Sequence, residues 1–120
     1  MTFREAIQAA GMTHRQLARA SGQSYRYVGM QLCGDRQLTP KLWRAALALA
    51  EARLAQFLAA SGAERPEATV EETRAQVAAF VAQARHFRDK AGSVQAREKW
   101  TIEVQRLEAL AAKLQEVVAW

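Results

Sequence analysis

Arg26 stands between two tyrosines, Tyr25 and Tyr27, in the segment SGQSYRYVGMQLCG, which covers residues 21–34. A guanidinium group can donate two hydrogen bonds to O6 and N7 of guanine, which is the commonest specific contact between proteins and DNA bases. A tyrosine can pack its ring on a thymine methyl or a sugar and donate its hydroxyl to a phosphate. These side-chain types therefore suit the recognition of nucleic acid.

The positive charge of the chain is concentrated in its first half. Residues 1–60 carry eight basic and three acidic side chains, whereas residues 61–120 carry nine of each, so the net charge of +5 belongs to the first half. This asymmetry is typical of a polyanion-binding module joined to a second module. We expect phosphate contacts from helix N-termini and the neighbouring loops. The candidates are His14, Arg15, Ser24, Arg36 and Lys41.

Residues suited to catalysis or metal binding are few. The chain has two histidines, His14 and His86, and one cysteine, Cys33, with no glycine-rich phosphate loop and no CxxC or HExxH spacing. A Cys33–His14 nucleophile pair would lack an orienting third group. We therefore expect no enzymatic activity, no metal and no cofactor. The lack of a long apolar run, of a signal-peptide pattern and of a second cysteine favours a cytoplasmic protein with no membrane span.

The elements that must position these residues are expected to be helices throughout. Strong helix formers dominate, and no window alternates between apolar and polar residues. Capping residues predict a helix from Phe3 to about residue 10, a second beginning after Thr13, a third over residues 24–33 capped by Ser24, and a long fourth from Pro40 to about residue 60. The predicted DNA-binding domain is residues 1–60.

The faces of the third helix follow from a turn of about 100° per residue. If Val28 faces the core, Leu32 and Tyr25 also lie on or near the core side. The outer face and its flanks then hold Arg26, Met30, Cys33, Gly29 and Tyr27. Gly29 costs about 1 kcal/mol relative to alanine inside a helix. This cost suggests that a DNA strand or the second helix approaches closely there.

In the second half of the chain, the sequence predicts a linker over residues 61–67 and an amphipathic helical hairpin over residues 68–120. Its two apolar stripes are out of phase across Ala91, Gly92 and Ser93, which favours a break, although one long helix with a stutter is an alternative. The stripes need a partner, either a second subunit in a homodimer or the same chain in a bundle. The residues expected to serve oligomerisation are Leu54, Phe57, Phe80, Phe87, Trp100, Leu107 and Leu114.

The segment MTHRQLARASGQSYRYVGMQLCGDRQLTP resembles the lambda-repressor-like helix-turn-helix family, which includes phage repressors and Cro proteins. The matching positions are Gly11, Thr13, residues 16–18, Gly22, Val28, Gly34 and Pro40. The resemblance covers residues 3–58 and implies that the third helix enters the major groove. It also implies that Tyr25, beside the cap, contacts DNA. The family often has a phosphate-binding glutamine at the position of His14, so histidine there is a departure.

The leading functional expectation is a sequence-specific DNA-binding transcriptional regulator, a repressor, acting as a dimer on a pseudo-palindromic operator of double-stranded DNA. The residues expected to read bases are Arg26, Tyr25, Tyr27, Met30 and Gly29. One alternative is a DNA-recognition subunit of a phage machine, such as a terminase small subunit. Another is an antitoxin or adaptor whose C-terminal helices bind a protein partner.

Overall fold

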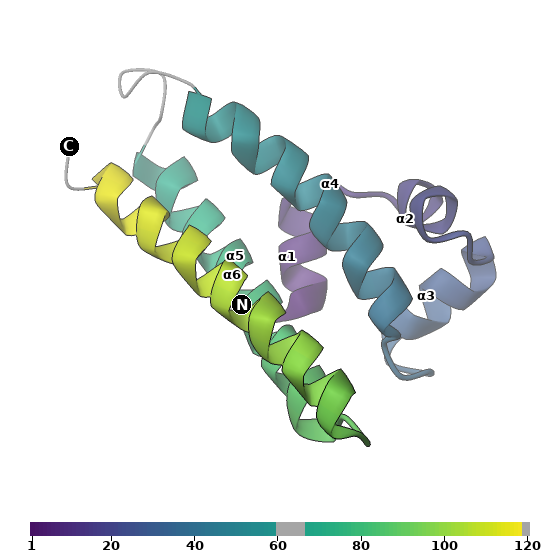
Figure 1. Ribbon diagram of the computed structural model, residues 1–120. Coiled ribbons are helices and arrows are strands. Elements are labelled where there is room, and N and C mark those ends of the chain that lie inside the picture. Colours follow the sequence, from purple (N-terminus) through teal and green to yellow (C-terminus); the bar gives the residue numbers. More distant parts are fainter. Residues whose placement is uncertain (60–66, 119–120) are drawn as a thin grey trace. The chain divides into compact units, whose positions relative to one another are not determined.

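The computed structural model describes residues 1–59 and 67–118, and these residues form six helices and no strand (Figure 1). The helices are α1 (Phe3–Ala9), α2 (His14–Ser21), α3 (Tyr25–Cys33), α4 (Pro40–Ala59), α5 (Glu67–Lys90) and α6 (Val94–Val118). The expected all-α fold is confirmed. None of the helices in the described ranges has the length and apolar character needed to span a membrane.

The chain divides into two compact units. The first unit is Arg4–Ala59, and the second contains α5 and α6 together with Met1–Phe3. The predicted linker lies outside the described residues except for Glu67, which is already the first residue of α5. The second unit is called the hairpin below.

Side-chain caps define the ends of α2 and the start of α3. The Thr13 hydroxyl accepts a hydrogen bond from the Gln16 backbone N–H at 3.1 Å, and Gln16 Oε1 accepts one from the Thr13 N–H at 2.9 Å. Gly22 ends α2 in the left-handed conformation, with φ of 71°. The Ser24 hydroxyl then accepts from the Tyr27 N–H at 3.1 Å. The predicted capping box and cap are confirmed, and only residues 22–24 separate the two helices.

The first unit packs α2 against α3 and α4. Each of its four helices contributes apolar side chains to the core, because each carries them at helical spacing. The buried apolar residues of this unit are Ala6, Ile7, Leu17, Val28, Leu32, Leu42, Trp43, Ala45, Ala46, Leu47 and Leu54. This core holds the short α2 and α3 in place, since helices of eight and nine residues are not stable alone.

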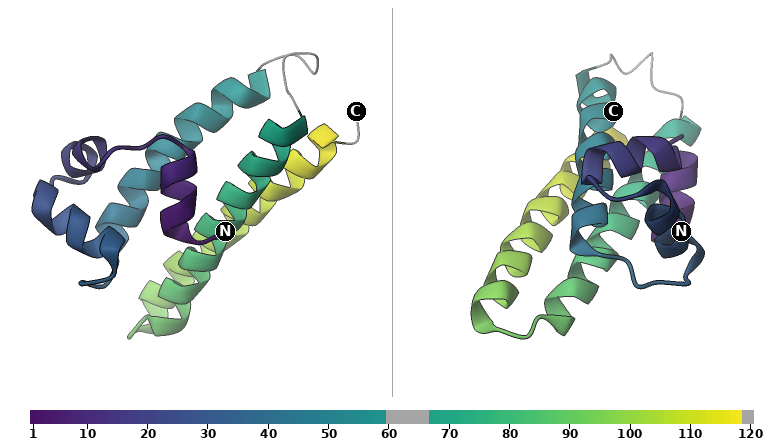
Figure 2. Two further views of the ribbon diagram at one scale, coloured as in Figure 1. Left: turned by 180° about the vertical axis from the view of Figure 1, so that it is seen from behind. Right: turned by 90° about the vertical axis from the view of Figure 1, so that its right-hand side faces the viewer.

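The hairpin turns at residues 91–93, as the phase break predicted. The Ala91 N–H donates to the Arg88 carbonyl at 3.2 Å, and the Ser93 hydroxyl caps α6 by accepting from the Ala96 N–H at 3.1 Å. The views in Figure 2 show α5 and α6 running antiparallel, side by side, from this turn. The alternative of one continuous helix with a stutter is therefore wrong.

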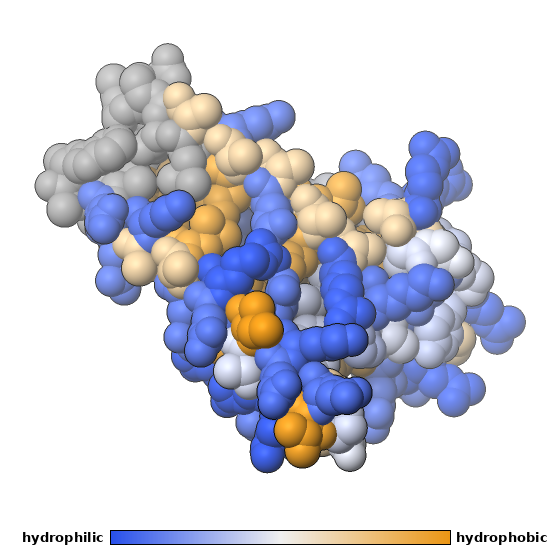
Figure 3. All heavy atoms as spheres, in the orientation of Figure 1, coloured by the Kyte–Doolittle hydropathy of each residue, from blue (hydrophilic) through white to orange (hydrophobic). Residues whose placement is uncertain are grey.

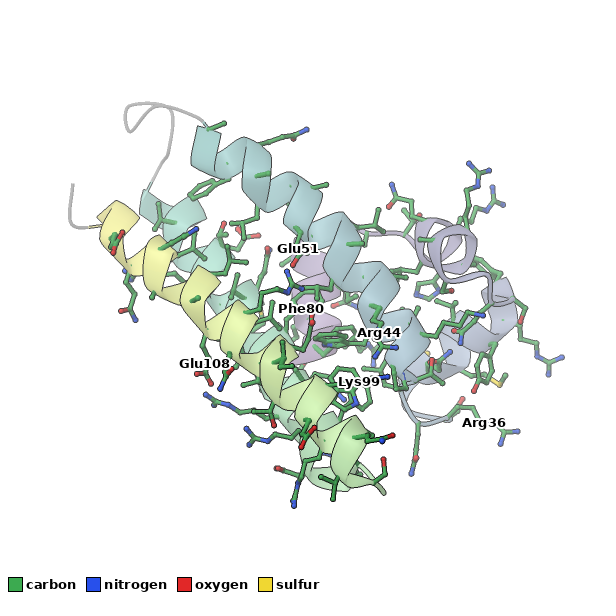
Figure 4. All side chains as sticks on the ribbon, viewed as in Figure 1. Arg36, Arg44, Glu51, Phe80, Lys99 and Glu108 are labelled. Atoms are coloured by element: carbon green, nitrogen blue, oxygen red, sulfur yellow. The ribbon has the colours of Figure 1, made fainter. Side chains whose placement is uncertain are left out.

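Four of the five residues predicted for oligomerisation on α5 and α6 are buried. The rings of Phe87 and Trp100 contact each other across the two helices, with centroids 4.9 Å apart and planes tilted by 34°. Phe80 is 2% exposed, Leu107 1% and Leu114 0%. Arg85 of α5 and Glu108 of α6, the second of which is labelled in Figure 4, add an ion pair of 2.6 Å between the two helices. The role of these residues in oligomerisation stays a prediction.

The remaining predicted oligomerisation residues lie on α4, where Leu54 is 6% exposed and Phe57 is half-buried. The exposed large apolar side chains of α6 are Val94 and Ile102. On the face drawn in Figure 3, hydrophilic side chains surround isolated apolar groups over the part of the hairpin nearest its turn. A dimer interface remains a prediction.

Candidate nucleic-acid interface

The outer face of α3 begins with Arg26, the second residue of the helix, and its side chain is exposed. Cys33, two turns further along, is also exposed, and Met30 between them is half-buried. Val28 is 0% exposed and Leu32 is 8% exposed, so both face the core. The predicted inner and outer faces are therefore confirmed for these residues, with Met30 less open to solvent than expected.

Tyr25 departs from the expectation drawn from the helical angle. It is 58% exposed, so its predicted position near the core side is wrong. The physical reason is that Tyr25 is the first residue of α3, where the packed core ends, and the helical angle carries no information on that boundary. Tyr27 is half-buried. The exposed phenol of Tyr25 thus lies beside Arg26 at the N-terminal end of α3.

His14, the first residue of α2, packs its half-buried side chain against α3. Its ring lies 5.7 Å from the ring of Tyr25, centroid to centroid, at an angle of 53°. Its Nδ1 atom lies 3.7 Å from the position that a methyl group on Gly29 would occupy. His14 also lines a cavity whose walls are Arg4, Ile7, Gln8, Met12, His14, Leu32 and Cys33. The imidazole therefore has a packing role beside its predicted phosphate contact.

Gly29 shows how close α2 comes to α3. The nearest atoms to a methyl group at this position belong to His14, and 3.7 Å is an ordinary van der Waals distance. We expect Gly29→Ala to raise the free energy of unfolding by about 1 kcal/mol, because alanine favours the helix and fits without displacing His14. Urea unfolding followed by circular dichroism measures this change. A loss of stability would show that α2 does require glycine here.

Two phosphate candidates lie in exposed positions on the α2 and α3 termini. Arg15 is exposed in the first turn of α2. The Ser24 oxygen accepts the capping hydrogen bond from Tyr27, so its hydroxyl hydrogen is still able to point to an external acceptor. Both residues lie at helix N-termini, whose N–H groups favour anions.

The other two phosphate candidates lie around the start of α4. Arg36 is exposed in the loop after α3, where its backbone N–H donates to the Met30 carbonyl at 3.2 Å, and Figure 4 shows its side chain pointing outward. Lys41 Nζ lies 4.0 Å from the position of a methyl group on Gly22, at the C-terminal end of α2. A cation there stabilises the helix dipole, so Lys41 has a structural role as well.

The basic side chains of the first unit face solvent. All eight are exposed, namely Arg4, Arg15, Arg19, Arg26, Arg36, Lys41, Arg44 and Arg53. Within the described part of the chain, Arg15, Arg19, Arg26, Arg36 and Lys41 form no ion pair. In the hairpin, by contrast, Arg85 pairs with Glu108. The positive charge around α2 and α3 is therefore available to an external polyanion.

Three polar side chains outside the predicted site residues form a closed ring of hydrogen bonds. Gln31 Nε2 donates to Gln23 Oε1 at 2.8 Å, Gln23 Nε2 donates to Thr39 Oγ1 at 3.1 Å, and Thr39 Oγ1 donates to Gln31 Oε1 at 2.9 Å. We call these three residues the polar ring. Gln31 is 5% exposed. The sequence did indicate that Gln31 is buried, because the helical angle that places Val28 inside also places Gln31 on the inner side of α3.

Among the described residues, no group of three or more His, Cys, Asp or Glu side chains gathers to bind a metal ion. In comparisons with known proteins, no family model, no curated protein and no solved structure matches the chain. What the interface binds must therefore be inferred from its own residues.

Proposed function

We propose that this protein binds double-stranded DNA sequence-specifically through α2 and α3 and acts as a transcriptional regulator of the repressor type. The observation that carries the proposal is the position of Arg26. Its unpaired guanidinium is exposed at the N-terminal end of α3, the second helix of a pair joined by a three-residue turn. Recognition helices of helix-turn-helix proteins contact bases mainly from this end.

The surroundings of Arg26 support the same proposal. Exposed Tyr25 lies beside it, and exposed Arg15 and Arg36 lie on α2 and on the loop after α3. Cations and hydroxyl groups in such positions supply the phosphate contacts that fix the register of a protein on DNA. The excess charge of the first unit supplies the sequence-independent part of the affinity.

A homodimer on a pseudo-palindromic operator is the form of binding we propose, because helix-turn-helix proteins generally occupy two half-sites about one helical turn apart. The test is selection of bound sequences from random double-stranded DNA with the purified full-length protein. An enriched sequence with two-fold symmetry is expected. Salt-sensitive binding without enrichment would overturn the proposal of base-specific reading, and an enriched single half-site would overturn the dimer alone.

Arg26→Ala is expected to weaken binding to the selected duplex by about 1–3 kcal/mol per half-site and to relax the preference at one base pair. The reason is the loss of two hydrogen bonds to one guanine. Competition binding with duplexes substituted at each position measures the change. Arg26→Lys, which retains the charge, should restore affinity for DNA of any sequence but not the base preference.

The matched control is Arg19→Ala, which also removes an exposed charge, near the C-terminal end of α2. It should leave the base preference unchanged. If Arg19→Ala and Arg26→Ala have the same effect, Arg26 contributes only charge, and its assignment as a base-reading residue is wrong.

A further inference from the structure

The geometry points to Gln31 as a positioning residue that fixes the orientation of α3 relative to α4, and thereby sets the discrimination between DNA sequences. The inference rests on the proposed function, since it assigns a further residue to the same interface. Gln31 does not belong to the outer face of α3, because it is 5% exposed. Its effect must therefore pass through the position of the helix.

The polar ring joins three parts of the first unit. Gln23 lies in the turn before α3, Gln31 lies on α3 itself, and Thr39 immediately precedes α4. Thr39 is anchored in turn, because its hydroxyl oxygen also accepts from the Leu42 N–H at 3.3 Å and so caps α4. Each side chain of the ring is thus attached to a different segment of backbone.

The hydrogen bonds of Gln31 allow one orientation of its amide. The Thr39 backbone N–H, which can only donate, lies 2.9 Å from Gln31 Oε1. Gln31 Nε2 faces two acceptors, Gln23 Oε1 at 2.8 Å and the Tyr27 carbonyl at 3.4 Å. Turning the amide over would place Gln31 Nε2 against the Thr39 N–H, which is also a donor, and Gln31 Oε1 against two acceptors. Because each contact has a required direction, the ring resists rotation and sliding of α3.

The other inner contacts of α3 lack this directionality. Val28 and Leu32 are apolar, and burial of apolar surface depends on area rather than on direction. Hydrogen bonds to base edges need the reading side chains held within about 0.5 Å of their productive position. Phosphate contacts carry no sequence information directly. Loss of the ring should therefore reduce sequence discrimination and leave binding to unrelated DNA intact.

The test compares affinities for the selected duplex and for a scrambled duplex of equal length at one salt concentration. Gln31→Met keeps the length of the side chain without its hydrogen bonds, and Thr39→Val keeps the shape of threonine without its hydroxyl. Both should lower the ratio of the two affinities about tenfold, which is the discrimination that one bidentate base contact supplies. Affinity for the scrambled duplex should not change.

Two control variants separate positioning from stability. Thr39→Ser retains the hydroxyl and should keep the wild-type ratio, and Ile7→Val weakens the core away from the ring and should also keep it. Circular dichroism identifies folded samples. If Gln31→Met fails to fold, the comparison of Thr39→Val with Thr39→Ser decides the question.

An unchanged ratio in folded Gln31→Met, or in folded Thr39→Val, would overturn the positioning role. A wild-type protein that prefers no sequence would instead overturn the proposed function, and this inference with it. The two outcomes are distinguishable. The positioning role is tested only when the wild-type protein binds the selected duplex much more tightly than the scrambled duplex.

Discussion

Raising the NaCl concentration from about 50 to about 200 mM is expected to weaken binding of the proposed dimer to its selected duplex about 10³-fold. Each protomer presents three exposed cations that we assign to phosphates: Arg15, Arg36 and Lys41. Two protomers would then neutralise about six phosphates, and each neutralised phosphate lowers the slope of log affinity against log salt by about 0.9. Fluorescence anisotropy with a labelled duplex measures this slope.

The same titration distinguishes the dimer from a monomer. A monomer with about three phosphate contacts would lose only about 40-fold in affinity over this range. Arg15→Ala should reduce the slope by about 0.9 for each protomer bound. Arg53→Ala, which removes an exposed cation from the distal part of α4, is the matched control and should not change it. Affinity independent of salt would contradict the assignment of this surface to phosphates.

Leu17→Ala is expected to lower the free energy of unfolding of the first unit by about 2–5 kcal/mol. Leu17 is 0% exposed and lies at the centre of α2, which packs against both α3 and α4. Its truncation removes buried apolar area and leaves a cavity that the surrounding helices fill only in part. Because small domains are stable by only about 5–15 kcal/mol, this loss is a large share of the total.

Urea unfolding measured by circular dichroism, alongside DNA binding at two temperatures, checks this expectation. Binding should be lost at the higher temperature, where the variant unfolds, and regained on cooling. Leu17→Met, which nearly conserves volume, is the control and should cost less than about 1.5 kcal/mol. A loss below about 1 kcal/mol for Leu17→Ala would mean that Leu17 is not held in a tightly packed core.

The sequence by itself determined the features that depend on near neighbours in the chain. The cap of α2 at Thr13, the cap of α3 at Ser24 and the end of α3 at Gly34 arise from interactions between residues at most four positions apart. The inward position of Val28 and the outward position of Arg26 follow from the helical repeat alone. Hence the helices, the turn between α2 and α3, and the candidate base-reading residue were predictable.

Only the tertiary structure decided the features that depend on residues distant in sequence. Gln23 and Thr39 are sixteen positions apart, and their hydrogen bond exists because α4 returns to the turn before α3. The exposure of Tyr25 depends on where the core ends, and the ring contact of Phe87 with Trp100 depends on how two long helices pair. Periodicity gives the direction of a side chain from its own helix, whereas packing between helices decides what that side chain meets.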